Sequence, residues 1–93
     1  MSTTLPRRVV PAESTIFQDL ATESIMLDLQ SENYFSLDDV GTRMWQLLSE
    51  HPETETVVAR LLEEYDVDEA TLRQDLAVLI GQLTGAGLLT VME

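Results

Sequence analysis

The stretch that decides the fold runs from Asn33 to Leu48 and reads NYFSLDDVGTRMWQLL. Its beginning, Tyr34–Leu37, is short and rich in aromatic residues, which is typical of a β-strand. The next two side chains, Asp38 and Asp39, can accept hydrogen bonds from the free N–H groups of a first helical turn. The apolar residues that follow share one helical face: Val40, Met44, Leu47 and Leu48. The stretch therefore predicts a strand, a cap and an amphipathic helix in direct succession.

Two segments before this stretch also have the pattern of strands. Residues 15–20 (TIFQDL) alternate loosely between apolar and polar side chains. Residues 24–30 (SIMLDLQ) predict a half-buried strand. Its apolar face carries Ile25, Leu27 and Leu29. Short links join the three strands, so we expect an antiparallel meander in which Tyr34–Leu37 lies at an edge.

The residues after Leu48 predict two more helices. Pro52 ends the first helix, because the residue before a proline is forced out of the α-helical region. Residues 54–65 have the apolar spacing of a second helix, and Asp68 is a good N-cap for a third that ends near Gly85. The sequence therefore predicts an α+β fold: a three-stranded antiparallel sheet followed by three helices, arranged like a winged helix-turn-helix.

Length and composition indicate one globular domain. The chain has 93 residues, of which 44% are hydrophobic, and it contains no cysteine. It has no run long enough to span a membrane and no apolar signal-peptide core, so we expect a cytoplasmic protein without a membrane partner. Residues 1–13 predict a mobile N-terminal arm, in which Val9 and Val10 could add to a sheet edge. Residues 89–91 predict a short closing strand or an extended tail.

Charge is the strongest feature of the composition. Seventeen acidic residues oppose five basic ones, which gives a formal net charge of −12, and all five cations are arginines. Such a surface repels the phosphate backbone of nucleic acids. A basic peptide or a basic partner protein would complement it, but the same charge would also keep a small protein soluble. Composition alone leaves both explanations open.

The sequence has no pattern typical of a catalytic or metal site. His51 is the only histidine, and with no cysteine there are too few ligands for a catalytic dyad or a zinc site. The carboxylates within residues 63–69 lack the spacing of a calcium-binding loop. No glycine-rich loop opens a helix to hold a phosphate. We therefore expect a protein that is not an enzyme and that uses no cofactor and no metal.

Two other classes of protein fit the size or the shape but not the residues. Acyl carrier proteins are small and acidic, but their attachment serine lies in an Asp-Ser-Leu motif at a helix start. Here Ser36 follows Phe35 inside a predicted strand. A winged-helix DNA-binding protein has the predicted shape, but its recognition helix, residues 69–84, would carry Arg73 as its single cation. We therefore expect no nucleic-acid partner.

A peptide-binding groove is the remaining hypothesis. An exposed edge strand presents unpaired N–H and C=O groups, and an extended peptide can pair with them by adding a strand. Beside the predicted edge strand Tyr34–Leu37, the third helix has a second, thinner stripe: Arg73, Ala77, Ile80 and Thr84. A groove between strand and stripe would combine main-chain pairing with apolar pockets. The alternative is that both the strand and the stripe belong to the core.

Two motifs in this order resemble the PqqD-like precursor-peptide recognition elements of ribosomally synthesised, modified peptides. In that family a Tyr-x-x-Leu-(Asp/Asn)-x-x-Gly-x-x-x-Trp run leads into the first helix, and a Tyr-Asp-Val element leads into a third helix ending in Gly-Leu. The first run is matched by Tyr34, Leu37, Asp38, Gly41 and Trp45. The second is matched by Tyr65, Asp66, Val67, Leu72, Asp75, Leu79, Leu83, Gly87 and Leu88.

The resemblance implies a recognition domain over residues 14–93. It implies that the leader segment of a precursor peptide binds as an antiparallel strand on the third strand, against the third helix. Position in that groove predicts these contact residues: Tyr34, Phe35, Ser36, Leu37, Glu69, Arg73, Leu76, Ala77 and Ile80.

Within that family, a chain of this size is most similar to the free-standing recognition proteins of lasso-peptide biosynthesis. Those proteins present the leader to a separate cysteine leader peptidase, and an ATP-dependent macrocyclase then acts on the core peptide. The resemblance therefore implies the leader peptide and the peptidase as partners, with the macrocyclase as a further one. The alternative is the peptide chaperone of pyrroloquinoline quinone biosynthesis, which works with a radical SAM enzyme.

Overall fold

The computed structural model describes residues 5–20 and 23–92. Its elements in chain order are β1 (Arg8–Pro11), β2 (Thr15–Asp19), β3 (Ser24–Asp28), β4 (Tyr34–Leu37), α1 (Asp39–Glu50), α2 (Thr54–Glu64), α3 (Glu69–Gly85) and β5 (Leu89–Met92). Strands β2, β3 and β4 form one antiparallel sheet in that order, and β1 pairs with β5 in a second sheet. The predicted α+β fold, with a three-stranded antiparallel sheet followed by three helices, is confirmed.

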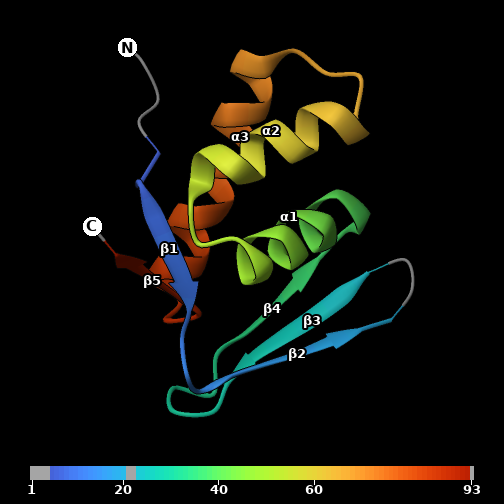
Figure 1. The fold of residues 1–93 in the computed structure, drawn as a ribbon. Helices are drawn as coiled ribbons and strands as arrows, with labels where there is room; N and C mark the ends of the chain where they lie inside the picture. Colours follow the sequence, from blue (N-terminus) through green and yellow to red (C-terminus); the bar gives the residue numbers. More distant parts are fainter. Residues whose placement is uncertain (1–4, 21–22, 93) are drawn as a thin grey trace.

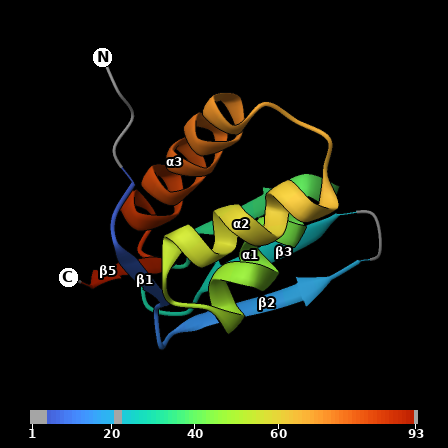
Figure 2. The same ribbon diagram turned by 45° about the horizontal axis from the view of Figure 1, so that its top comes forward.

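The three helices lie on one side of the β2–β3–β4 sheet, and within the described residues no helix covers its other side (Figures 1 and 2). The core between sheet and helices consists of large side chains that are at most 2% exposed. They include Met26 of β3, Leu47 and Leu48 of α1, Leu61 of α2, and Leu76, Ile80 and Leu83 of α3. Each such side chain contributes roughly 1.5–3 kcal/mol of burial free energy, so this layer holds the helices on the sheet.

Side-chain caps fix where α1 and α3 begin. The Asp38 carboxylate accepts from the Gly41 N–H at 2.8 Å, and the Asp68 carboxylate accepts from the Thr71 N–H at 3.1 Å. Both caps agree with the sequence pattern. A Cβ atom on Gly41 would lie only 3.2 Å from Asp38 Oδ1 and 3.3 Å from Leu37 Cβ. Glycine at this position therefore allows the chain to pass from β4 into α1 through a very tight turn.

The N-terminal segment differs from the mobile arm expected for residues 1–13. Arg8–Pro11 forms β1, which pairs with β5 near the other end of the chain, and Val9 is fully buried. The Val9 N–H also donates to the Pro52 carbonyl at 2.9 Å. The expectations that Val9 and Val10 add to a sheet edge and that a short strand closes the chain are confirmed. The sequence did not show that these two strands pair with each other, because they lie at opposite ends of the chain. Residues 1–4 lie outside the described residues.

The buried face of β3 is the opposite of the one that the alternating pattern predicts. On the side of the sheet that no helix covers, Ile25 is 41% exposed and Leu27 is half-buried, and Leu29, in the turn after β3, is 58% exposed. The face toward the core instead carries residues that are at most 4% exposed: Ser24, Met26 and Asp28. The strand is half-buried, as expected, but its more apolar face is the exposed one.

Hydrogen bonds explain how two polar side chains of β3 come to be buried. The hydroxyl oxygens of Ser24 and Thr42 lie 2.7 Å apart. Asp28 accepts hydrogen bonds from the hydroxyl groups of Ser14 and Ser31. A buried polar group with a partner avoids most of the desolvation penalty. Because these partners come from other parts of the chain, strand alternation alone could not identify the inner face.

Candidate functional site

Strand β4 is an edge of its sheet, because β3 is the only strand that pairs with it among the described residues. Along an antiparallel ladder, hydrogen-bonded and non-hydrogen-bonded residue pairs alternate. The Asp28 N–H donates to the Asn33 carbonyl at 2.9 Å, which sets the phase of this alternation. In this phase the main-chain groups of Tyr34 and Ser36 point away from β3. The edge therefore offers the N–H and C=O groups of two residues to a further strand.

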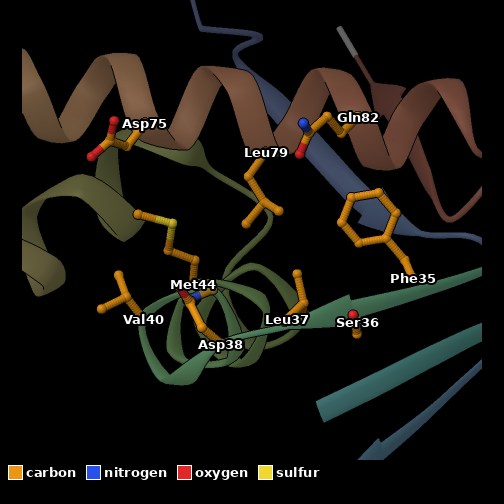
Figure 3. A pocket seen from close by; sticks show the side chains of 10 residues that line it. Phe35, Ser36, Leu37, Asp38, Val40, Met44, Asp75, Leu79 and Gln82 are labelled. Atoms are coloured by element: carbon orange, nitrogen blue, oxygen red, sulfur yellow. The ribbon is translucent and has the colours of Figure 1, made fainter. Parts of the chain in front are cut away.

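A groove of about 300 Å³ runs between β4 and α3 (Figure 3). Phe35 and Gln82 lie at one end of it, and Val40 and Asp75 lie at the other. Between them, Leu79 projects from α3 toward β4 (Figure 3). The remaining lining residues are Ser36, Leu37, Asp38, Gly41 and Met44. The open main-chain edge and an apolar floor therefore lie side by side.

A second pocket of about 190 Å³ continues the groove beyond the end of β4. It shares Val40, Met44 and Asp75 with the first pocket. Its other walls come from the connection between α2 and α3 and from the first turns of α3: Tyr65, Val67, Thr71 and Leu72. A mostly apolar pocket at the end of a strand-binding groove is suited to one side-chain anchor of an extended peptide.

The groove is acidic. Asp38 and Asp75 line it, and no arginine or histidine is among the described residues that form either pocket. A nearby cation of α1, Arg43, is engaged elsewhere, because it pairs with Glu64 of α2 at 2.7 Å. This pairing holds the pKa of the Glu64 carboxyl below its ordinary value. A peptide that enters the groove therefore meets carboxylates and no competing cation.

The structure brings the predicted strand residues together at the edge of the groove. Phe35, Ser36 and Leu37 are among its lining residues. Tyr34 is 74% exposed and lies at the same strand edge, with its side chain on the outer face of the sheet because side chains alternate along a strand. Leu37 is 5% exposed and forms part of the wall between groove and core.

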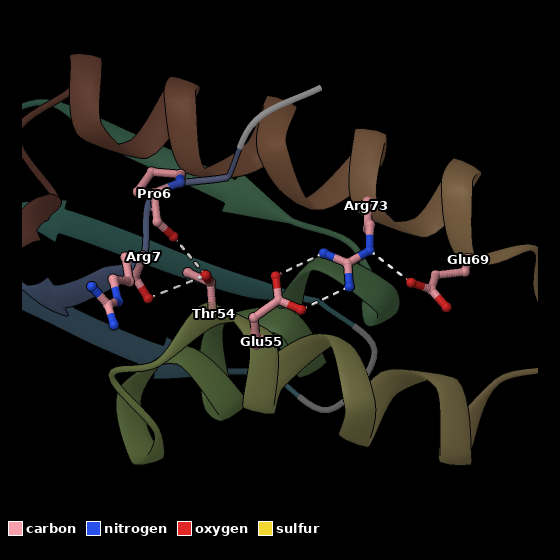
Figure 4. A network of polar contacts seen from close by, with 6 residues as sticks. All are labelled: Pro6, Arg7, Thr54, Glu55, Glu69 and Arg73. Atoms are coloured by element: carbon pink, nitrogen blue, oxygen red, sulfur yellow. Dashed lines mark hydrogen bonds and ion pairs between the residues drawn. The ribbon is translucent and has the colours of Figure 1, made fainter. Parts of the chain in front are cut away.

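Arg73 and Glu69, two of the predicted helix residues, lie away from the groove. Arg73 donates to Glu69 at 2.8 Å and to both carboxylate oxygens of Glu55 at 2.7 and 2.8 Å, so it links α3 to α2 (Figure 4). The hydrogen bonds from Arg73 hold the pKa of the Glu55 carboxyl below its ordinary value. On the same side of the molecule, the Thr54 hydroxyl donates to the Pro6 carbonyl (Figure 4). This contact network stabilises helix packing.

The other predicted helix residues do not line the groove either. Leu76 and Ile80 are 0% and 2% exposed in the core, and Ala77 is half-buried outside both pockets. The helix face that meets the groove consists of Asp75, Leu79 and Gln82. Because α3 is apolar on more than one side, the sequence pattern placed the groove on a face about two residues away. Two of the three, Asp75 and Leu79, belong to the second family motif of the sequence analysis. That motif was the sequence feature from which this helix face could have been identified.

The sequence profile of the family described as "Coenzyme PQQ synthesis protein D (PqqD)" matches residues 23–89. The match covers β3, β4, all three helices and both pockets. The chain belongs to the PqqD family. Comparison with curated proteins gives no match.

Two solved structures resemble this PqqD-family chain. One is described as "TbiB1 in Complex with the TbiA(beta) Leader Peptide". The two sequences are 32% identical, the alignment covers 89% of this chain and 96% of TbiB1, and the TM-score is 0.82. The other is described as "Lasso peptide synthetase B1 complexed with the leader peptide". The two sequences are 22% identical, the alignment covers 89% of this chain and 98% of the other, and the TM-score is 0.78. The second similarity shows the fold alone.

Other kinds of site find no support in the part of the PqqD-family chain that the structure describes. No group of three or more His, Cys, Asp or Glu side chains is placed there to hold a metal ion. Likewise, none of the helices in residues 5–20 and 23–92 combines the length and the apolarity needed to cross a membrane.

Proposed function

We propose that this protein binds the leader segment of a ribosomally synthesised precursor peptide as an additional antiparallel strand on β4. The observation that carries the proposal is the open β4 edge with a groove of about 300 Å³ beside it. Membership of the PqqD family supports it, and so does the 32% identical TbiB1, whose structure contains a leader peptide. The recognition domain extends over residues 14–93, and β1 packs against its C-terminal strand.

Strand addition and side-chain pockets have separate roles in this binding. Main-chain hydrogen bonds to Tyr34 and Ser36 supply affinity without selecting a sequence, and the pockets select the side chains that alternate toward α3. In this proposal the protein acts by holding its peptide and not by catalysis. A peptide held near an enzyme is present at a raised effective concentration, which favours its modification over that of free peptides.

The proposal places the protein in lasso-peptide biosynthesis in the cytoplasm, with a separate cysteine leader peptidase as protein partner and an ATP-dependent macrocyclase as a further one. The outer face of the sheet supports a protein partner, because Ile16, Ile25 and Tyr34 are 41–74% exposed on it. Exposed apolar patches of this kind mark interaction surfaces. This face adjoins β4, so a peptidase seated there would lie next to the bound leader.

A second candidate is the peptide chaperone of pyrroloquinoline quinone biosynthesis, which works with a radical SAM enzyme. The match to the PqqD profile favours this candidate. The leader-bound TbiB1 at 32% identity favours the lasso pathway. The two candidates share the same groove and differ in the enzyme that receives the peptide, so co-purification with each enzyme type separates them.

The leader segments of short precursor peptides encoded beside the gene provide the direct test. Each segment is titrated into ¹⁵N-labelled protein, and the amide shifts are followed by NMR. We expect shift changes concentrated at Tyr34–Leu37 of β4 and at Asp75, Leu79 and Gln82 of α3. Binding that perturbs neither β4 nor this face of α3, or no binding by any of these segments, would overturn the proposal.

A further inference from the structure

The chain runs in opposite directions along the two walls of the groove, so the two ends of the groove can be told apart. Along α3 the lining residues follow in the order Thr71, Asp75, Leu79 and Gln82. Along the other wall the chain runs from Phe35, beside Gln82, to Val40, beside Asp75 (Figure 3). The groove is of mixed polarity where it follows β4, acidic at the end of β4, and mostly apolar in the pocket beyond.

Asp75 is the carboxylate at this transition, because it lines both pockets. It forms no hydrogen bond or ion pair with any other described residue. Glu69, six residues earlier on the same helix, is paired with Arg73. Asp75 is exposed in the free protein, and a basic side chain that arrives with the ligand would give its carboxylate a charge-assisted partner. Asp38 adds a second negative charge to the same groove, although its carboxylate also caps α1.

We propose that Asp75 is a specificity-determining residue of the groove: it selects leader peptides that carry an arginine or lysine next to an apolar anchor. This inference rests on the proposed function, because it assigns a role within the same groove. The anchor occupies the 190 Å³ pocket formed around Val40, Met44 and Leu72. The basic side chain lies at the mouth of that pocket, against Asp75.

The antiparallel sheet also fixes the order of these features in the peptide. A strand added antiparallel to β4 runs from the Val40 end of the groove toward the Phe35 end. The apolar anchor is therefore on the N-terminal side, the basic residue follows it, and the segment that pairs with β4 comes last. A peptide with an acidic residue at the middle position would place like charges together, which is unfavourable.

A display library of random 20-residue peptides tests this without knowledge of the natural leader. The library is selected in parallel on the wild-type protein, on Asp75→Asn and on Glu13→Gln. The last variant is a matched control, because it removes one negative charge at an exposed position in the β1–β2 connection. Selected peptides are then sequenced, and single peptides are titrated against all three proteins.

We expect peptides selected on the wild type and on Glu13→Gln to be enriched in Arg or Lys at one position between an apolar anchor and a strand-forming segment. Asp75→Asn should lose that enrichment and should bind a wild-type-selected peptide about tenfold more weakly, as expected for a charge-assisted hydrogen bond. Asp75→Lys should instead select Asp or Glu at the same position.

Two outcomes would overturn the inference in different ways. If Asp75→Asn selects the same basic residue as the wild type, Asp75 does not determine specificity, while peptide binding at β4 stands. If the selected peptides cause no NMR shift changes in β4 or in the groove face of α3, the peptide-binding role of the groove fails, and the role of Asp75 fails with it.

Discussion

The three-stranded sheet has two edges, and the hollows beside them differ in size and in the residues that line them. At the β4 edge, Leu79 and Gln82 of α3 leave a groove of about 300 Å³. At the β2 edge, large side chains of α1 reach toward the strand. The rings of Phe17 and Trp45 have centroids 6.0 Å apart, and the Gln46 side chain donates to Asp19 at 3.3 Å.

The difference between the edges lies in the neighbouring helix rather than in the strands. Both β2 and β4 pair with β3 on one side only, so both have main-chain groups that face outward. The cavity beside β2 is about 200 Å³, is lined by Phe17, Trp45, Gln46, Ser49 and Glu50, and shares no lining residue with the two pockets beside β4. An edge strand thus becomes a peptide-binding site where the adjacent helix leaves room for a further backbone and its side chains.

The largest effect should come from Ser36→Pro, which removes an outward-facing N–H from the middle of β4. Proline is tolerated at an edge position whose N–H does not bond to the sheet, so the fold should persist. We expect leader affinity to fall about 100-fold or more, because a main-chain hydrogen bond is lost and the ring obstructs the incoming strand. Titration calorimetry measures the affinity, and thermal unfolding checks the fold.

Ser36→Ala is the matched control, because it removes the hydroxyl group and keeps the N–H. Its affinity should remain close to that of the wild type. Undiminished binding by a folded Ser36→Pro variant would show that the peptide does not pair with β4, and the contrast between the two edges would then lose its functional meaning.

The next largest effect should come from filling the groove at Val40, which lines both pockets and is 37% exposed. Val40→Arg places a long cationic side chain where the anchor and the basic residue of the leader would bind. We expect affinity to fall about tenfold or more from loss of the apolar contact alone. Val78→Arg makes the same change on α3 at a position that is 53% exposed and lines neither pocket. Equal losses in both variants would point to a general charge effect and not to the groove.

The strand, the caps and the helices could be predicted from the sequence because each depends on residues close together in the chain. Asp38 and Asp68 cap their own helices within three residues. The inner face of β3 could not be predicted in this way, because Ser24 and Asp28 are buried by partners such as Thr42 and Ser14 that are distant in sequence. That β1 pairs with β5 could not be predicted for the same reason, because the two strands lie at opposite ends of the chain.

Three of the predicted strand residues line the groove, and the predicted helix residues lie elsewhere on α3. Phe35, Ser36 and Leu37 line the groove, since an edge strand has only two faces to choose between. A helix turns by roughly 100° per residue, so a stripe chosen two residues away points elsewhere. On α3 the apolar pattern does not identify which face of the helix points inward, because Val78 is exposed and Ile80 is buried although both are apolar.

Replacement of Asp28, which is linked to segments next to both edge strands, should lower the free energy of unfolding by an amount that depends on pH. Asp28 accepts from Ser14, just before β2, and from Ser31, in the turn before β4, and these hydrogen bonds hold its pKa below the ordinary value. A carboxyl whose pKa is lowered by folding contributes stability that is complete above its unfolded-state pKa, about 3.9, and lost as the pH falls through its folded-state pKa. Asp28→Asn should therefore be less stable than the wild type at neutral pH, with a difference that narrows below about pH 4.

Urea unfolding at a series of pH values measures this difference. Asp66→Asn, which changes an exposed carboxylate in the α2–α3 connection, is the control and should follow the wild type across the series. If the gap between Asp28→Asn and the wild type stays constant as the pH falls, the Asp28 carboxylate does not contribute through its charge.

The smallest effect should come from Arg73→Ala, although Arg73 is the cation that the sequence pattern placed in the groove. Its ion pair with Glu55 is at the surface, with side-chain exposures of 31% and 68%. Surface pairs contribute about 0–1 kcal/mol, so we expect a loss of stability within that range and a leader affinity within about twofold of the wild type. A loss of affinity comparable to that of Val40→Arg would place the peptide on the α2 side of α3. The open groove beside β4 would then be incidental, and the difference between the two edges of the sheet would not explain binding.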